Sequence, residues 1–285
     1  MAEKILITSD STTDLGPDLL ARYNIPVLPL VVSLNDVDHK DGLDITPEMI
    51  YRNYEQKKNL PKTAAPSLAD CTEFFRKYVE QGYHIVHFTI SADMSCTYQN
   101  CLIAAEEFEN VHVVDTRNLS TGGGLLVLRA AELAEQGMEA AAIAEECRRL
   151  TAYVDVTFVI DSLEFLHKGG RCSTVAMLGA NLMKFKPCII VKDGKMTVGK
   201  KYRGKFEAVL LQYLADRIGD GSNIDKRHVF ITHGGCAPDV VEACVQKLRS
   251  LGDFPNIHVT HAGSTICSHC GPNTLGVLFL RDQPI

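Results

Sequence analysis

The chain has 285 residues, and 35 acidic side chains against 29 Lys and Arg leave a formal net charge of −6 at pH 7. Sequence-independent binding of nucleic-acid phosphates needs a basic excess, so this charge argues against a nucleic-acid role. Hydrophobic residues make up 46% of the chain and charged residues 22%, which excludes a disordered or fibrous protein. The length is typical of two domains.

Strands and helices alternate in the first half, which predicts a mostly parallel sheet flanked by helices. The predicted strands span residues 5–8, 26–33, 84–90 and 111–115. Thr46 and Ser67 are the expected N-caps of two of the helices. The predicted helices span residues 15–23, 46–57, 67–82, 95–107, 120–136 and 139–150.

The second half is typical of a mixed sheet with helices, because Asp193 and Gly194 form the expected turn of a hairpin. Its predicted strands span residues 154–160, 188–192, 196–202, 229–232, 257–261 and 277–280, and its helices residues 173–183, 205–218 and 238–251. The fold class is therefore α/β with two domains. We place an N-terminal domain at residues 1–155 and a C-terminal domain at residues 156–285.

The compartment follows from the cysteines and the apolar segments. The ten cysteines are spread along the chain at a density too low for a disulfide framework, so we expect reduced thiols. No signal segment opens the chain, and the longest apolar stretches are far shorter than the roughly 20 residues needed to span a bilayer. These features predict a cytoplasmic protein with no integral membrane segment.

Two glycine motifs resemble nucleotide-binding signatures but lack essential residues. Residues 194–201 have the spacing of a P-loop, yet Lys201 replaces the Ser or Thr that binds Mg²⁺. Gly122, Gly123 and Gly124 start a predicted helix, but the third glycine of the dinucleotide fingerprint falls on Val127. We therefore expect no cofactor and no ATP site in this chain.

A metal site is also weakly indicated. Cys267, His269 and Cys270 form half of a zinc-binding pattern, and a second spaced pair is absent from the sequence. We therefore predict no metal.

Hydroxyl, glycine and histidine residues cluster where predicted strands end, and open α/β sheets bind ligands there. The clusters are SDSTTDL (9–15), TAAPS (63–67), ISADMSCTY (90–98), LHKGGR (166–171) and SHCGPNTLG (268–276). In this order they resemble the DegV family of bacterial lipid-binding proteins, which includes the fatty-acid-binding subunit of the bacterial fatty acid kinase. The resemblance covers about residues 4–280.

Three positions depart from the patterns common in that family. Cys96 and Asn273 stand where the family usually has glycine, and Cys172 stands where it usually has isoleucine. Glycine often supplies a positive φ, which Asn tolerates better than Cys does. The resemblance therefore leaves the backbone at Cys96 and Asn273 to be checked.

The resemblance implies a long-chain fatty acid whose chain is buried in the N-terminal domain, with its carboxylate near the domain junction. By resemblance, Thr63, Ser95 and His269 match the head-group residues, and Thr97 is a weaker addition. A neighbouring carboxylate would favour the protonated form of His269. The apolar residues that could line a tunnel, or equally form an ordinary core, are Ile85, Val86, Phe88, Leu102, Ile103, Leu125, Leu126 and Leu128.

The resemblance also implies a separate ATP-dependent kinase that phosphorylates the bound carboxylate, so this chain would be a lipid-binding subunit and not an enzyme. Lys200, Lys201, Arg203 and Lys205 put four cations within six residues. Arg203 and Arg171 are the candidates for contacting the kinase or the transferred phosphoryl group, unless they belong to a solvated face. The alternative is a self-contained hydrolase or transferase acting on a lipid-like acyl or phosphate compound, with Ser95 as nucleophile and His269 as base.

Overall fold

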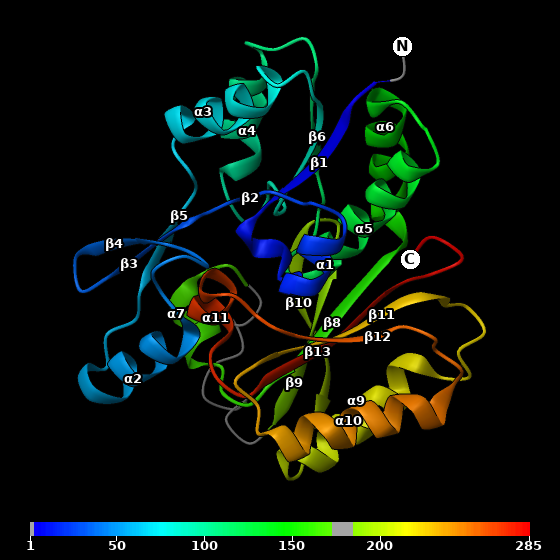
Figure 1. Cartoon of the computed structure of the whole chain (residues 1–285). Coiled ribbons are helices and arrows are strands. Elements are labelled where there is room, and N and C mark those ends of the chain that lie inside the picture. Colours follow the sequence, from blue (N-terminus) through cyan, green and yellow to red (C-terminus); the bar gives the residue numbers. More distant parts are fainter. Residues whose placement is uncertain (1–2, 173–184) are drawn as a thin grey trace.

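A parallel sheet forms from the first half of the chain in the order β2-β1-β6-β7 (Figure 1). The computed structural model describes residues 3–172 and 185–285, so the helix predicted at residues 173–183 lies outside the described residues. The strands are β1 (Ile5–Asp10), β2 (Val27–Leu28), β6 (His84–Thr89) and β7 (Val111–Asp115). The predicted parallel sheet is confirmed.

Helices cover both faces of this sheet, α3 and α4 on one and α5 and α6 on the other (Figure 1). Ile85 faces α3 and α4, whereas its neighbour Val86 faces α5 and α6, as the alternation of side chains along a strand requires. The capping box of Ser67 and Asp70 opens α3 as predicted. The helices are α1 (Pro17–Arg22), α3 (Leu68–Val79), α4 (Thr97–Ala105), α5 (Thr121–Glu135) and α6 (Ala140–Leu150).

One predicted strand is wrong. Residues 26–33 were expected to form a single strand, but the chain leaves the parallel sheet after β2 and enters a second sheet at β3 (Val31–Leu34). Pro29 lies at the break, because it has no backbone N–H to continue a ladder. The second sheet is antiparallel, with the order β4-β3-β5, and the sequence analysis missed β4 (Val37–Lys40) and β5 (Lys62–Ala64).

The second half forms a six-stranded mixed sheet in the order β10-β9-β8-β13-β11-β12, as predicted. Its pairs are antiparallel except for β11 and β12, and the turn at Asp193 and Gly194 joins β9 to β10. The strands are β8 (Val154–Ile160), β9 (Lys186–Lys192), β10 (Lys195–Tyr202), β11 (Asp225–Gly234), β12 (Ile257–His261) and β13 (Thr274–Leu280). On one face lie α9 (Phe206–Ile218) and α10 (Pro238–Leu251).

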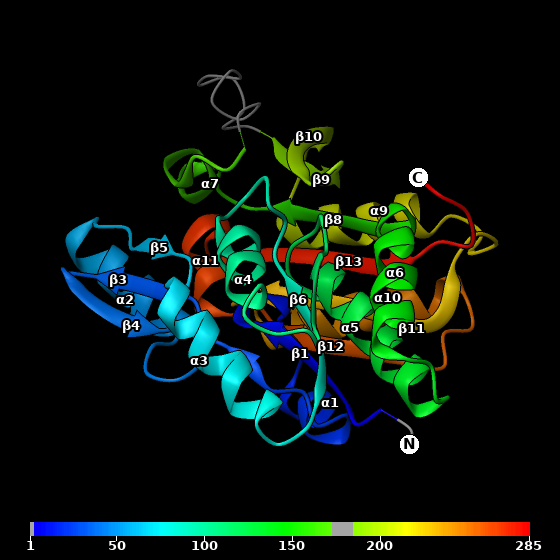
Figure 2. The ribbon, with the colours of Figure 1, turned by 90° about the horizontal axis from the view of Figure 1, so that it is seen from above.

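Helix α5 joins the two large sheets, because it contacts β1 and β6 of one and β8 and β13 of the other (Figure 2). A Cβ at Gly122 would lie 2.3 Å from Cγ2 of Val156, so the glycine allows α5 to approach β8 closely. Apolar side chains from both sheets form one continuous core around α5. The division of the chain into domains at residue 155 stays a prediction.

The sequence analysis also missed the two short helices α7 (Glu164–Gly169) and α11 (Ser264–Cys270). Helix α11 packs against α7, against β3 and β5, and against α2 (Pro47–Lys57). Phe165 of α7 contacts the rings of Tyr51 and Tyr54 on α2. Tertiary contacts of this kind stabilise helices too short to be stable alone.

Two buried carboxylates hold the amino end of α11. Asp14 accepts a hydrogen bond from the Gly263 amide at 2.8 Å, and Asp41 accepts one from the Ser264 amide at 2.9 Å. Burial raises the pKa of Asp14 to about 8, although its hydrogen bonds to Ser120 and Gly263 oppose the shift. Asp14 therefore caps a helix that lies 249 residues further along the chain.

We expect ionisation of Asp14 to lower the free energy of unfolding as the pH rises from about 4 to about 8, whereas the buried histidines with a lowered pKa raise it below pH 6.5. The folded chain keeps the proton of Asp14 over this range and the unfolded chain loses it near the ordinary pKa of 3.8. The contribution of Asp14 to the free energy of unfolding is therefore fully present below pH 4, and it is lost as the pH rises through the pKa of Asp14 in the folded chain. When the folded chain binds one proton more than the unfolded chain, the free energy of unfolding changes by about 1.4 kcal/mol per pH unit.

Urea unfolding at a series of pH values would measure the slope. Asp14→Asn cannot ionise and keeps an acceptor for the Gly263 amide, so we expect this variant to lose the negative contribution of Asp14 to the slope between about pH 4 and pH 8. Asp18→Asn changes an exposed carboxylate of α1 and serves as the matched control. Equal slopes in the wild type and Asp14→Asn would contradict the prediction.

Candidate functional site

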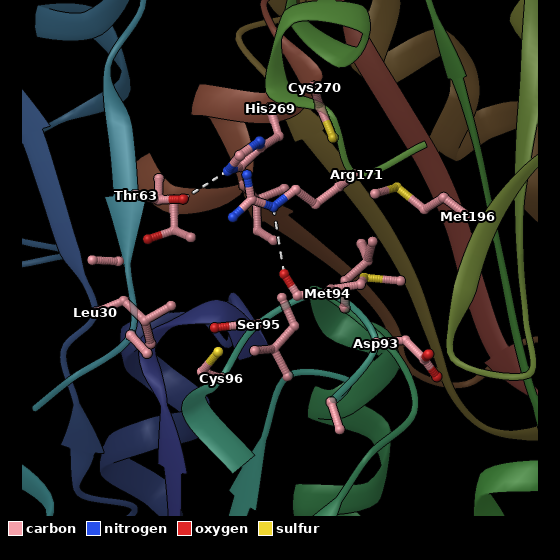
Figure 3. A pocket seen from close by; sticks show the side chains of 17 residues that line it. Leu30, Thr63, Asp93, Met94, Ser95, Cys96, Arg171, Met196, His269 and Cys270 are labelled. Atoms are coloured by element: carbon pink, nitrogen blue, oxygen red, sulfur yellow. Dashed lines mark hydrogen bonds between the residues drawn. The ribbon is translucent and has the colours of Figure 1, made fainter. Parts of the chain in front are cut away.

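A cavity of about 410 Å³ opens beside α11, where loops of the parallel sheet, strand β5 and strand β10 meet (Figure 3). This volume lies in the range of small-molecule binding sites. Its walls are mostly apolar. The lining residues are Leu30, Thr63, Ala64, Ala65, Ile90, Ala92, Asp93, Met94, Ser95, Cys96, Leu119, Arg171, Met196, Thr265, Ile266, His269 and Cys270.

Polar side chains from four separate segments meet in this cavity (Figure 3). Thr63 comes from β5 and His269 from α11, and Oγ1 of Thr63 lies 2.7 Å from Nε2 of His269. Ser95 comes from the loop between β6 and α4, and Arg171 follows α7. The structure thus brings together three of the four residues predicted to bind a carboxylate, together with one of the two predicted partner contacts.

His269 is neutral in the chain without ligand. Burial and, to a smaller extent, the neighbouring Arg171 lower its pKa to about 4, whereas the Gly169 backbone opposes the shift. A Cβ at Gly169 would lie 2.5 Å from Nδ1 of His269, so only glycine leaves room for the ring. No carboxylate of the described residues favours the protonated form that the sequence analysis considered, so such a carboxylate would have to come from a ligand.

Arg171 has no acidic partner among residues 3–172 and 185–285. Its Nη1 donates to the Gly169 carbonyl at 3.0 Å, and its Nε lies 3.5 Å from the Met94 carbonyl. The guanidinium lines the cavity beside His269 (Figure 3). A cation held only by carbonyl groups can still accept an anion, and its planar fork suits a carboxylate or a phosphate.

The other two predicted site residues lie outside the cavity lining. Thr97 is fully buried behind Ser95, and its hydroxyl lies 2.8 Å from that of Ser95. The structure therefore places Thr97 where it can orient Ser95. Arg203 is exposed after the end of β10, and nearby Lys200 pairs with Asp216.

The apolar side of the cavity consists of residues that the sequence analysis did not single out. Leu30 follows β2, Met94 precedes α4, Met196 lies on β10 and Ile266 lies on α11. The eight apolar residues proposed from the sequence do not line it, because six are buried in the core and Leu102 and Ile103 are exposed on α4. The spacing of hydrophobic residues shows which face of a helix or strand is buried. It does not show where a cavity lies between elements.

A smaller cavity of about 30 Å³ lies next to the first one. The two share Leu119, Ile266 and Cys270. Phe158 of β8 and Leu278 of β13 line the smaller cavity, so its wall belongs to the six-stranded sheet. The smaller cavity therefore separates the shared residues of the first cavity from the six-stranded sheet.

Comparison with known proteins decides the family. The sequence profile described as "Uncharacterised protein, DegV family" matches residues 4–282. A DegV domain-containing protein of Clostridium acetobutylicum is 32% identical over 98% of this chain and 99% of its own length. The chain belongs to the DegV family.

Solved structures of DegV proteins have the same fold. A fatty-acid-binding DegV family protein from Thermus thermophilus is 32% identical, with a TM-score of 0.89 over 98% of this chain and 99% of its own. A stearic-acid-binding protein from Eubacterium ventriosum is 26% identical, with a TM-score of 0.83 over 97% and 98% of the two chains. The predicted fold class and family are therefore confirmed. In the described part of this DegV chain, no helix is long and apolar enough to cross a membrane.

The two lost DegV glycines have different consequences. Cys96 has φ −74°, which any residue adopts, so cysteine is compatible with this backbone. Asn273 has φ 53°, in the left-handed region where Asn is the next most tolerant residue after Gly. The backbone therefore accommodates both substitutions.

The three residues of the half zinc pattern, Cys267, His269 and Cys270, have separate surroundings in this DegV chain. The thiol of Cys267 donates to the Ala262 carbonyl, whereas His269 and Cys270 line the cavity. Among the residues that the structure describes, no group of three His, Cys, Asp or Glu side chains is placed to hold a metal ion.

We expect His269 of the ligand-free DegV chain to titrate near pH 4, and Arg171→Gln to raise its pKa. Removal of the guanidinium takes away a repulsive charge, whereas burial, the larger cause, remains and keeps the value below 6.5. NMR titration of the imidazole C–H signals, assigned with His269→Gln, would measure both values. An unchanged pKa in Arg171→Gln would contradict the electrostatic part of this account.

Proposed function

We propose that this chain binds a long-chain fatty acid, with the carboxylate at Thr63, Ser95, His269 and Arg171 and the chain in the apolar part of the cavity. One observation carries the proposal: a largely apolar cavity gathers two hydroxyls, an imidazole and a guanidinium that has no acidic partner among the described residues. Fatty-acid-binding DegV proteins with the same fold support it.

The energetics are compatible with tight binding. Burial of an acyl chain of about sixteen carbons contributes a favourable free energy on the order of 11 kcal/mol, at ~0.8 kcal/mol per methylene, before the costs of association are subtracted. Association costs roughly 4–15 kcal/mol, so much of the cavity has to exist before the ligand arrives. Hydrogen bonds to an ionised acceptor are about twice as strong as neutral ones, which favours a carboxylate at the polar end.

The contacts of Ser95 and His269 favour binding over hydrolysis. A nucleophile needs its base within hydrogen-bond reach, and the base needs a third group to orient it. Nε2 of His269 instead contacts Thr63, while the Ser95 hydroxyl contacts Thr97. Nδ1 of His269 faces the Gly169 backbone and has no carboxylate partner in residues 3–172 and 185–285.

We further propose that the chain presents the bound carboxylate to a separate ATP-dependent kinase, which forms an acyl phosphate. Arg171 lies in the cavity next to the carboxylate site, where its fork can also hold a transferred phosphoryl group. Arg203 is exposed and free of ion pairs in the described part of the chain, so it can contact a kinase surface. Catalysis then comes from the partner.

Organic extraction of the purified protein followed by mass spectrometry tests the first proposal, and we expect about one fatty acid per chain. Alanine at Thr63, Ser95 or His269 removes one donor to a charged acceptor, worth roughly 1.5–3 kcal/mol, so we expect roughly 10- to 100-fold weaker binding. Ser222→Ala removes an exposed hydroxyl outside the cavity and serves as the control. No copurified lipid, and no binding of added fatty acid by the wild type, would overturn the proposal.

If Arg203 contacts the kinase, the effect of removing its charge on the rate of acyl-phosphate formation should depend on ionic strength. Arg203→Glu should slow acyl-phosphate formation by a partner kinase, more at low salt than at high salt, with unchanged fatty-acid content. Lys226→Glu, which reverses an exposed cation at the start of β11, is the matched control. Wild-type rates of Arg203→Glu at every salt concentration would assign Arg203 to the solvated surface.

A further inference from the structure

Ser91 begins the loop that carries Ser95, and its backbone holds that loop in place. The residue is fully buried and follows the end of β6. Its amide donates to the Asn118 carbonyl at 2.9 Å, and its carbonyl accepts from the amides of Met94 at 2.9 Å and Ser95 at 3.2 Å. The amide of Ser95 is therefore bonded directly to the backbone of Ser91.

The hydroxyl of Ser91 connects this loop to the second half of the chain. It donates to the Gly194 carbonyl at 2.8 Å and accepts from the Asp93 amide at 3.2 Å. Gly194 belongs to the turn between β9 and β10 of the six-stranded sheet. One buried side chain therefore holds a loop of the parallel sheet against a hairpin turn 103 residues further along the chain.

The hairpin turn lies unusually close to this loop. A Cβ at Gly194 would lie 2.7 Å from Oγ of Ser91 and 2.8 Å from a carboxylate oxygen of Asp93, and the glycine has φ 80°. An ion pair of 3.4 Å between Lys195 and Asp93 joins the same two segments. The position of the loop therefore depends on the position of the hairpin.

The Ser95 hydroxyl depends on this loop for its own position. Its Oγ lies 2.8 Å from Oγ1 of Thr97, so the side chain is fixed at the start of α4 while the backbone is fixed to Ser91. Binding groups have to be held within about 0.5 Å of their productive geometry, often by residues that do not touch the ligand. Ser91 lies outside the cavity lining, so it acts on a ligand through its neighbours.

We propose that Ser91 is a positioning residue for the Ser95 hydroxyl at the carboxylate site, with the hairpin turn at Gly194 as its support. This inference rests on the proposed fatty-acid function and adds to it a residue from outside the cavity. Without the Ser91 hydroxyl, the buried Gly194 carbonyl loses this donor and the Asp93 amide loses this acceptor. Because unsatisfied polar groups are costly, the loop rearranges, and the change reaches Ser95 through the Ser91 carbonyl.

A double-mutant cycle tests this coupling, with binding of hexadecanoic acid to the delipidated full chain measured by calorimetric titration. We expect Ser91→Ala to weaken binding about three- to tenfold, within the range of coupling between residues of one hydrogen-bond network. In the Ser95→Ala background the same substitution should change the affinity by less than about twofold, because no hydroxyl is left to misplace. Gly194→Ala displaces the turn from the other sheet and should give the same pattern.

Thr157→Val is the matched control for the loss of a buried hydroxyl. Oγ1 of Thr157 on β8 lies 2.8 Å from the Tyr213 hydroxyl, outside the cavity lining. We expect this variant to unfold at a lower temperature and to bind hexadecanoic acid as the wild type does. Circular dichroism would establish that all variants are folded.

The outcomes separate this inference from the function on which it rests. Equal weakening by Ser91→Ala with and without the Ser95 hydroxyl, or no weakening by Ser91→Ala, would overturn the role of Ser91 and leave fatty-acid binding intact. Unchanged affinity in Ser95→Ala would overturn the head-group role of Ser95 together with this inference. Absence of binding by the wild type would overturn the proposed function as well.

Discussion

The position of α11 depends on two carboxylates buried in the first half of the chain. Asp14 and Asp41 have no cation against them among the residues described, and they are satisfied largely by backbone amides at the start of α11 and by hydroxyls. A buried carboxyl group without hydrogen-bond partners would be costly, so these acids favour a helix that begins at this position. His269, near the carboxyl end of that helix, consequently faces Thr63 on β5.

A second constraint is the placement of α5 between the two large sheets. Because α5 packs on both, the sheets share one core and cannot move apart without exposing apolar surface. The cavity lies beside this core, with walls from both halves of the chain. A preformed, largely apolar space of this kind is what a long flexible ligand needs, since most of its binding free energy comes from burial.

The polar side of the cavity suits an anion that arrives and leaves. Burial lowers the pKa of His269 to about 4, and among the described residues Arg171 contacts the carbonyl groups of Met94 and Gly169. Two hydroxyls complete the set, so the site presents donors whose geometry is fixed by four separate backbone segments. Such preorganisation suits the proposed binding of a carboxylate, and the exposed position of Arg171 suits the proposed contact with a second anionic group.

The sequence by itself determined the fold class and most of the long elements, because hydrophobic period, caps and turn residues act locally. It did not show α7 and α11, which have six and seven residues and are held by tertiary contacts, nor the break at Pro29 between two sheets. Similarity to a family pointed to Thr63, Ser95 and His269, but only the tertiary structure placed Thr97 behind Ser95 and Arg203 away from the cavity. The lining of the cavity and the contact between Ser91 and Gly194 also came from the tertiary structure alone, since they depend on segments far apart in the chain that no local pattern relates.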